Sequence, residues 1–145
     1  MNTLKFDIKM CYTNTFIKVS EDCPVKQSEI PVQKKDNKPA HVIQYELLIN
    51  NPYKFGHEDL IFEVFIRQKG IPEETPAAEM EKIKEELFSK GHPCLRASAL
   101  TKRYGFGAHY NEEQKIAIYP MESKEYNAFL NDKSVKILNA MRTKR

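Results

Sequence analysis

A basic, glycine-bearing stretch over residues 92–110 holds the side chains best suited to chemistry. Between positions 96 and 103 it supplies guanidinium, hydroxyl and ammonium groups, and no acidic residue interrupts it. These groups are the donors that bind carboxylates and phosphates in proteins. We therefore expect a site for a small anionic ligand here. The candidate ligand-binding residues are Arg96, Ser98, Lys102, Arg103, Tyr104 and His109.

Cys94 suggests a second chemistry, nucleophilic catalysis. A thiol attacks as its thiolate, which a histidine base and a nearby positive charge favour. His92 and His109 are the candidate bases, and Arg96 could supply the charge. Against this, no nucleophile motif surrounds the cysteine, and free cysteines often lie in the core as small apolar residues. A thiol-dependent hydrolase or transferase is thus the alternative function, and whether the chain is an enzyme stays open.

Metal and nucleotide sites have weaker support in the sequence. Metal-ligating atoms occur at Cys23, His92, Cys94 and His109. Zinc sites usually include a close pair of ligands such as CxxC, which the sequence lacks. It also lacks the glycine-rich loops that bind nucleotides. We therefore expect neither a metal nor a cofactor.

Basic residues allow a third function, weak binding to nucleic acid. The net charge of +3 is modest for such a role. Basic and aromatic residues also alternate in one place only, whereas nucleic-acid-binding surfaces combine them repeatedly. We therefore rank nucleic-acid binding below binding of a small ligand. The residues concerned are Lys102, Arg103, Lys133, Lys136, Arg142, Lys144 and Arg145.

A β-hairpin over residues 104–119 is predicted to position the end of the basic stretch. Aromatic and small residues alternate from Tyr104 to Tyr110, which places Gly105, Gly107 and His109 together on one strand face. The polar tetrad NEEQ then suits a turn before the returning strand. Glycines leave room on a strand face, so a packed helix or a ligand could approach there.

The first part of the chain is predicted to contain one strand, a loop and two helices. Residues 13–19 alternate and are rich in β-branched side chains, as in a strand. Two prolines and a polar run make 20–38 a long loop. A helix is expected from Pro39 to just before Asn50. Residues 60–66 are apolar on nearly every side, which fits a helix or a buried strand, and acidic residues before the run favour the helix.

The second part of the chain is predicted to be mainly helical outside the hairpin. Thr75 and Pro76 form a start signal for a helix that ends before Gly91, with Met80, Ile83 and Leu87 on its apolar face. Two short helices are expected over 122–130 and 134–141, and a basic tail over 142–145.

Length and composition indicate a single α+β domain. At 145 residues, with 41% hydrophobic and 30% charged residues, the chain can bury a core and stay folded. We expect a small antiparallel sheet packed with four to five helices over residues 1–145. No apolar stretch suits a membrane span or an export signal. The odd number of cysteines then favours reduced thiols and a cytoplasmic location.

Several stretches are distinctive: NTFIKVSEDCP, QYELLINNPY with LIFEVFIRQKGIPE, PCLRASALTKRYGFGAHYNEEQKIAIYPMESKEY and the closing AMRTKR. Together they resemble a family of small bacterial proteins known only as a domain of unknown function. The resemblance covers almost the whole length and is most specific between PCLRAS and IAIYP. The family pattern usually has tryptophan and isoleucine where this chain has Phe106 and Ala108. The resemblance implies a bacterial cytoplasmic protein and no established activity, cofactor or catalytic residue.

Overall fold

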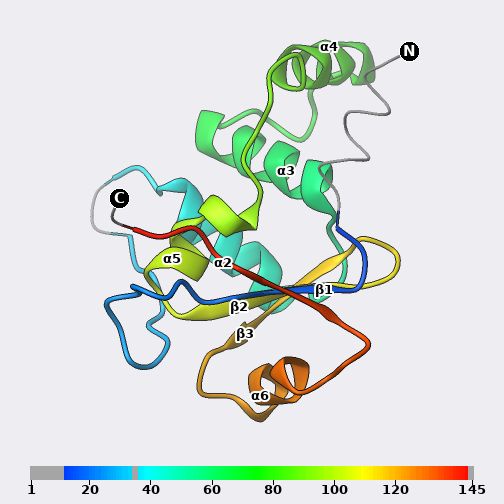
Figure 1. Cartoon of the computed structure of the whole chain (residues 1–145). Helices are drawn as coiled ribbons and strands as arrows, with labels where there is room; N and C mark the ends of the chain where they lie inside the picture. The colour runs from blue at the N-terminus through cyan, green and yellow to red at the C-terminus, as the bar shows by residue number, and fades with distance from the viewer. Residues whose placement is uncertain (1–11, 34–35, 144–145) are drawn as a thin grey trace.

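A four-stranded mixed sheet forms the centre of the fold (Figure 1). The computed structural model describes residues 12–33 and 36–143. The strand order is β3-β2-β1-β4. The strands are β1 (Thr15–Lys18), β2 (Phe106–Tyr110), β3 (Ile116–Pro120) and β4 (Lys136–Asn139).

Five α-helices and one 3-10 turn occur in the described part of the chain. Helices α2, α3 and α5 lie on one side of the sheet, and α6 lies on the other (Figure 1). The fold is therefore a single small α+β domain, as the sequence predicted. The helices are α2 (Ala40–Asn50), α3 (His57–Lys69), α4 (Ala77–Leu87), α5 (Ala99–Lys102) and α6 (Lys124–Leu130), and the turn is η1 (Leu95–Ala97).

The predicted hairpin is present as β2 and β3, which pair antiparallel, with Gly107 opposite Tyr119. Strand β1 pairs antiparallel with β2 on one side and parallel with β4 on the other. The sheet is thus mixed, where the sequence predicted antiparallel pairing throughout. A parallel partner needs a long crossover, and local patterns do not reveal which strands such a crossover joins.

The helix predicted over 134–141 is wrong, because Lys136–Asn139 forms strand β4. The short apolar run there fits either periodicity. The segment forms a strand rather than a helix because its main chain pairs with β1. The Lys136 N–H donates to the Asn14 carbonyl at 3.1 Å, and the Ala140 N–H donates to the Lys18 carbonyl at 2.9 Å. Those bonds to the ends of β1 satisfy groups that a helix would have satisfied locally.

Two apolar layers enclose the sheet. The larger layer joins alternate strand residues to α2, α3 and α5, and includes Ile17, Phe106, Ala108, Tyr110, Ile118, Ile43, Leu48, Leu60 and Leu100. The smaller layer lies under α6 and includes Phe16, Val19, Tyr126 and Val135. The predicted division of β2 is therefore correct: its aromatic residues face the larger layer, and Gly107 faces α6.

The run over 60–66 is helical, as favoured, and belongs to α3. Helix α4 also forms, but Pro76 takes the N-cap position predicted for Thr75, and the Thr75 hydroxyl donates to the Pro72 carbonyl instead. None of the α4 residues is buried. Figure 1 shows α4 beyond α3, away from the sheet. No helix in the described ranges has the length and apolarity needed to cross a bilayer.

Candidate functional site

Three side chains form a hydrogen-bonded chain on the α6 side of the sheet. The Tyr53 hydroxyl lies 2.8 Å from Nδ1 of His109 and 2.8 Å from the Tyr119 hydroxyl. His109 belongs to β2, Tyr119 to β3, and Tyr53 to the loop between α2 and α3. Tyr53 thus links two strands of the hairpin through side chains that come from three separate parts of the sequence.

The loop that carries Tyr53 runs along the outer edge of β3. Its Tyr53 N–H donates to the Ile116 carbonyl at 2.8 Å, and the Ile116 N–H donates to the Phe55 carbonyl at 2.9 Å. Tyr53 has φ 61°, a left-handed conformation that bulky residues rarely adopt. Such backbone strain costs on the order of 1–3 kcal/mol and is often found at functional sites. The conformation lets a residue next to helices on one side of the sheet reach a histidine on the other.

Aromatic rings enclose the imidazole. The Phe129 ring of α6 stacks on His109 with centroids 4.2 Å apart and planes 27° apart. Phe129 also contacts Tyr119 and Phe16, at 5.3 and 4.9 Å between centroids. His109 is only 8% exposed. Its second ring nitrogen, Nε2, is buried and has no hydrogen-bond partner among the described residues.

Burial keeps His109 and Tyr53 uncharged at neutral pH. It lowers the pKa of His109 below the ordinary 6.5, and the nearby Asp132 carboxylate only partly opposes that shift. Burial also raises the pKa of Tyr53, and the Tyr119 hydroxyl adds to the increase. At neutral pH His109 is therefore an uncharged imidazole and Tyr53 an uncharged phenol, and both can donate and accept hydrogen bonds.

Cys94 and His109 do not come together. Cys94 Sγ lies 3.4 Å from the hydroxyl of Tyr12, whose ring packs edge-on against Tyr110 in the larger core layer. His109 lies on the opposite face, under α6. His92 donates from Nε2 to the Leu87 carbonyl at 2.7 Å. The histidines proposed as bases are thus engaged elsewhere.

The candidate anion-binding residues lie around α5, apart from His109. Arg96 donates through Nε to the Asn139 carbonyl at 2.8 Å. The Ser98 hydroxyl caps α5 and donates to Oε1 of Gln44 at 2.7 Å. Tyr104 stacks on His41 with centroids 5.1 Å apart. Arg96 and Ser98 therefore fasten this segment to β4 and α2, whereas Lys102 is half-buried and Arg103 is exposed.

Metal-ligating side chains do not cluster in the described ranges, residues 12–33 and 36–143. No group of three or more His, Cys, Asp or Glu side chains there could hold a metal ion. Cys23 and Cys94 are both free thiols.

The chain matches the model of a family of unknown function, DUF6157, over residues 8–145. The chain belongs to this family. Because the match spans every described strand and helix, the His109 cluster lies within the DUF6157 domain. Searches of curated proteins and of solved structures found no match.

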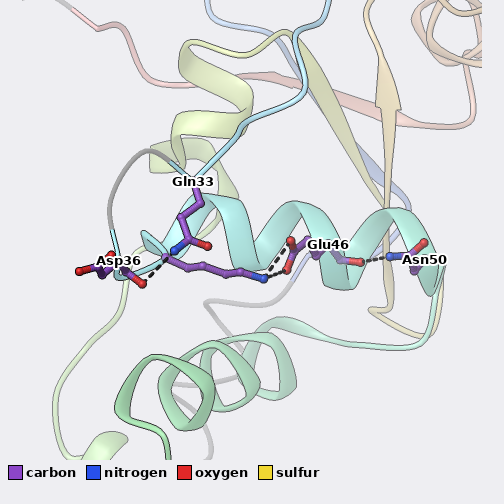
Figure 2. A network of polar contacts seen from close by, with 5 residues as sticks. Gln33, Asp36, Glu46 and Asn50 are labelled. Atoms are coloured by element: carbon purple, nitrogen blue, oxygen red, sulfur yellow. Dashed lines mark hydrogen bonds and ion pairs between the residues drawn. The ribbon is translucent and has the colours of Figure 1, made fainter.

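Two of the hollows on the surface of this DUF6157 domain lie beside helix α3. The first is polar, has a volume of about 700 Å³, and lies between the beginning of α2 and the end of α3. Figure 2 shows Gln33 and Asp36 at the beginning of α2, with Glu46 and Asn50 farther along it. Lys38 pairs with Glu46 at 3.0 Å, and both side chains are more than 40% exposed. Exposed pairs contribute about 0–1 kcal/mol, so this network is a solvated surface.

The second hollow is apolar, has a volume of about 530 Å³, and lies between α3 and α4. Its apolar lining comes from Phe65, Ile71, Ile83 and Leu87, and His92 also lines it. The apolar face predicted for α4 is therefore real, but it is only partly covered by the described residues.

Sequence patterns missed Tyr53 and Phe129 as partners of His109, and Tyr119 as the partner of Tyr53. Asn51-Pro52 correctly signals the end of a helix, but nothing local indicates that the next residue contacts β2. The hairpin register does carry one signal: it places Tyr119 opposite Gly107, two positions from His109 on the same face.

Proposed function

We propose that this protein is a binding module and that its site is the His109 cluster, formed by His109, Tyr53, Tyr119 and Phe129. The observation that carries this proposal is the buried Nε2 atom without a partner among the described residues. The large majority of buried side-chain polar atoms are hydrogen-bonded, and leaving one unpaired costs about 1–3 kcal/mol. Reserving this atom for a ligand explains why the fold tolerates the cost.

The surroundings of His109 favour a small, uncharged ligand. Phenyl and phenol rings provide apolar contact area, and buried charges are costly unless they are paired. The Asp132 carboxylate is close enough to act on the His109 pKa, and its negative charge opposes an anion. Phe129, which stacks on His109, is the side chain that would move to admit the ligand. It belongs to the seven-residue helix α6, of which only Tyr126 is buried, so little packing opposes the movement.

An anion site at Lys102 and Arg103 stays a separate prediction, since neither residue is buried. The thiol-enzyme alternative, Cys94 with His92 or His109, loses support, because Cys94 and His109 lie on opposite sides of the sheet and His92 donates to the Leu87 carbonyl. We also propose a bacterial cytoplasmic setting, where free thiols such as Cys23 and Cys94 persist.

The binding proposal is tested by NMR with three five-membered-ring probes: cyclopentanone, cyclopentanol and pyrrole. At least one should shift the ring resonances of His109 and Phe129 in the wild type. The shift should disappear in His109→Leu and persist in His41→Leu. His41 is a matched control, because burial also lowers its pKa and it stacks on an aromatic ring.

Two results would contradict the proposed site. One is that none of the three probes perturbs His109. The other is that a perturbation survives in His109→Leu. If His109→Leu does not fold, His109→Gln serves instead, and it should change the order in which the three probes bind.

A further inference from the structure

We infer that Tyr53, whose hydroxyl is also hydrogen-bonded to Tyr119, holds His109 in the tautomer that carries its proton on Nε2, so that the site selects neutral ligands with an acceptor oxygen, such as a carbonyl. This inference rests on the proposed function, because it names the ligand class of the same site. It comes from the directions of the two hydrogen bonds that link Tyr119, Tyr53 and His109.

The Tyr53 hydroxyl has one hydrogen and two partners, each at 2.8 Å. Two arrangements satisfy it. In the first, Tyr119 donates to Tyr53, and Tyr53 donates to Nδ1 of His109, which leaves the imidazole proton on Nε2. In the second, every bond reverses: Nδ1 donates to Tyr53, Tyr53 donates to Tyr119, and Nε2 becomes an acceptor.

Acid and base strengths favour the first arrangement. A phenol, with an ordinary pKa of about 10, is a good donor, and an imidazole nitrogen, with an ordinary pKa of about 6.5, is a much better base than a phenol oxygen. The bond from Tyr53 to Nδ1 therefore joins the stronger donor to the stronger acceptor. Donation from Tyr119 polarises the Tyr53 hydroxyl further and strengthens that bond.

The first arrangement fixes the hydrogen-bonding role of Nε2, the imidazole nitrogen that has no partner among the described residues. Nε2 then presents a buried N–H, which requires an acceptor and rejects another donor. A charged acceptor is disfavoured, because Asp132 acts on the same imidazole and the two tyrosines supply no positive charge. An uncharged carbonyl oxygen meets both conditions.

The tautomer is measured directly by the ¹⁵N chemical shifts of the His109 ring. We expect a protonated Nε2 and an unprotonated Nδ1 in the wild type. Tyr119→Phe should leave this unchanged, because Tyr53 still donates to Nδ1. Tyr53→Phe should produce a mixture of tautomers, because Nδ1 loses its donor. A protonated Nδ1 in the wild type would overturn the inference, whatever binds.

The same probes separate this inference from the proposed function. Cyclopentanone accepts hydrogen bonds and cannot donate, whereas pyrrole donates through its N–H. Binding of cyclopentanone at least tenfold tighter than pyrrole supports the inference. Binding of pyrrole in preference overturns the ligand class but keeps the site. If Nε2 is protonated and no probe binds, both the proposed function and the ligand class are wrong. That result is expected if a buried water is the only hydrogen-bond partner of Nε2.

Discussion

Gly107 and His109 occupy the same face of β2, but the space available under α6 differs between the two positions. A Cβ atom at position 107 would collide with the Phe16 ring and lie 2.7 Å from Cε2 of Tyr126. Two positions on, the face has space for an imidazole under Phe129. The glycine therefore permits close packing of α6, and that packing brings Phe129 over His109.

Gly107→Ala should destabilise the protein, because the added methyl group has no volume to occupy. Overpacking of this kind costs about 1–3 kcal/mol, and Gly107→Val should cost more. Urea unfolding followed by circular dichroism measures the change. Gly91→Ala is a suitable control, since a Cβ there meets no atom within 4 Å. Equal stability of Gly107→Ala and wild type would mean that α6 packs differently in solution.

At the scale of elements, α4 differs from α2, α3 and α5, which pack on the sheet, in how much of its surface is buried. Leu48 of α2 is 1% exposed and belongs to the larger core layer, whereas α4 contributes no buried residue. Helix α4 nevertheless has the clearest sequence signals. Its start, stop and amphipathic pattern specify a helix, but they do not specify how closely the rest of the chain covers it.

Leu48→Ala should cost about 2–5 kcal/mol, the usual range for a buried leucine, while Ile83→Ala in α4 should cost about 1 kcal/mol or less. Chemical unfolding of the two variants under identical conditions gives the comparison. A cost for Ile83→Ala near that of Leu48→Ala would contradict partial exposure and indicate that something covers the apolar face of α4.

Local patterns predicted the elements well and the long-range contacts poorly. The hairpin and the α3 helix follow from alternation, turn residues and acidic first-turn residues. Strand β4 was missed because its pairing with β1 crosses most of the chain. The site shows the same division: His109 was a candidate because of its strand face, whereas Tyr53 is 56 positions away along the chain and contacts it only through the fold.

For the whole molecule, stability should fall when the pH drops from about 7.5 to about 5.5. Burial lowers the pKa of both His41 and His109 below 6.5 in the folded protein. In that window the unfolded chain binds protons that the folded protein rejects, so the free energy of unfolding decreases. The carboxylates of Glu122 and Asp132, whose pKa values are also lowered, lose their contribution only at more acidic pH.

Urea unfolding at the two pH values measures this decrease. The double variant His41→Leu, His109→Leu should show a smaller pH dependence than the wild type. An unfolding free energy that is equal or higher at the lower pH would contradict the neutral state assigned to the His109 cluster.

The place of β1 in the sheet has a consequence for synthesis. Thr15 pairs with Tyr110 and Lys136, so the strand at the centre of the sheet is made long before either neighbour. At about 5–20 residues per second, a ribosome needs on the order of 5–20 s to reach the first of those neighbours. Phe16 and Ile17, both fully buried in the finished protein, have no sheet partner during that interval. These two fully buried residues are thus among those that a nascent-chain chaperone would shield longest.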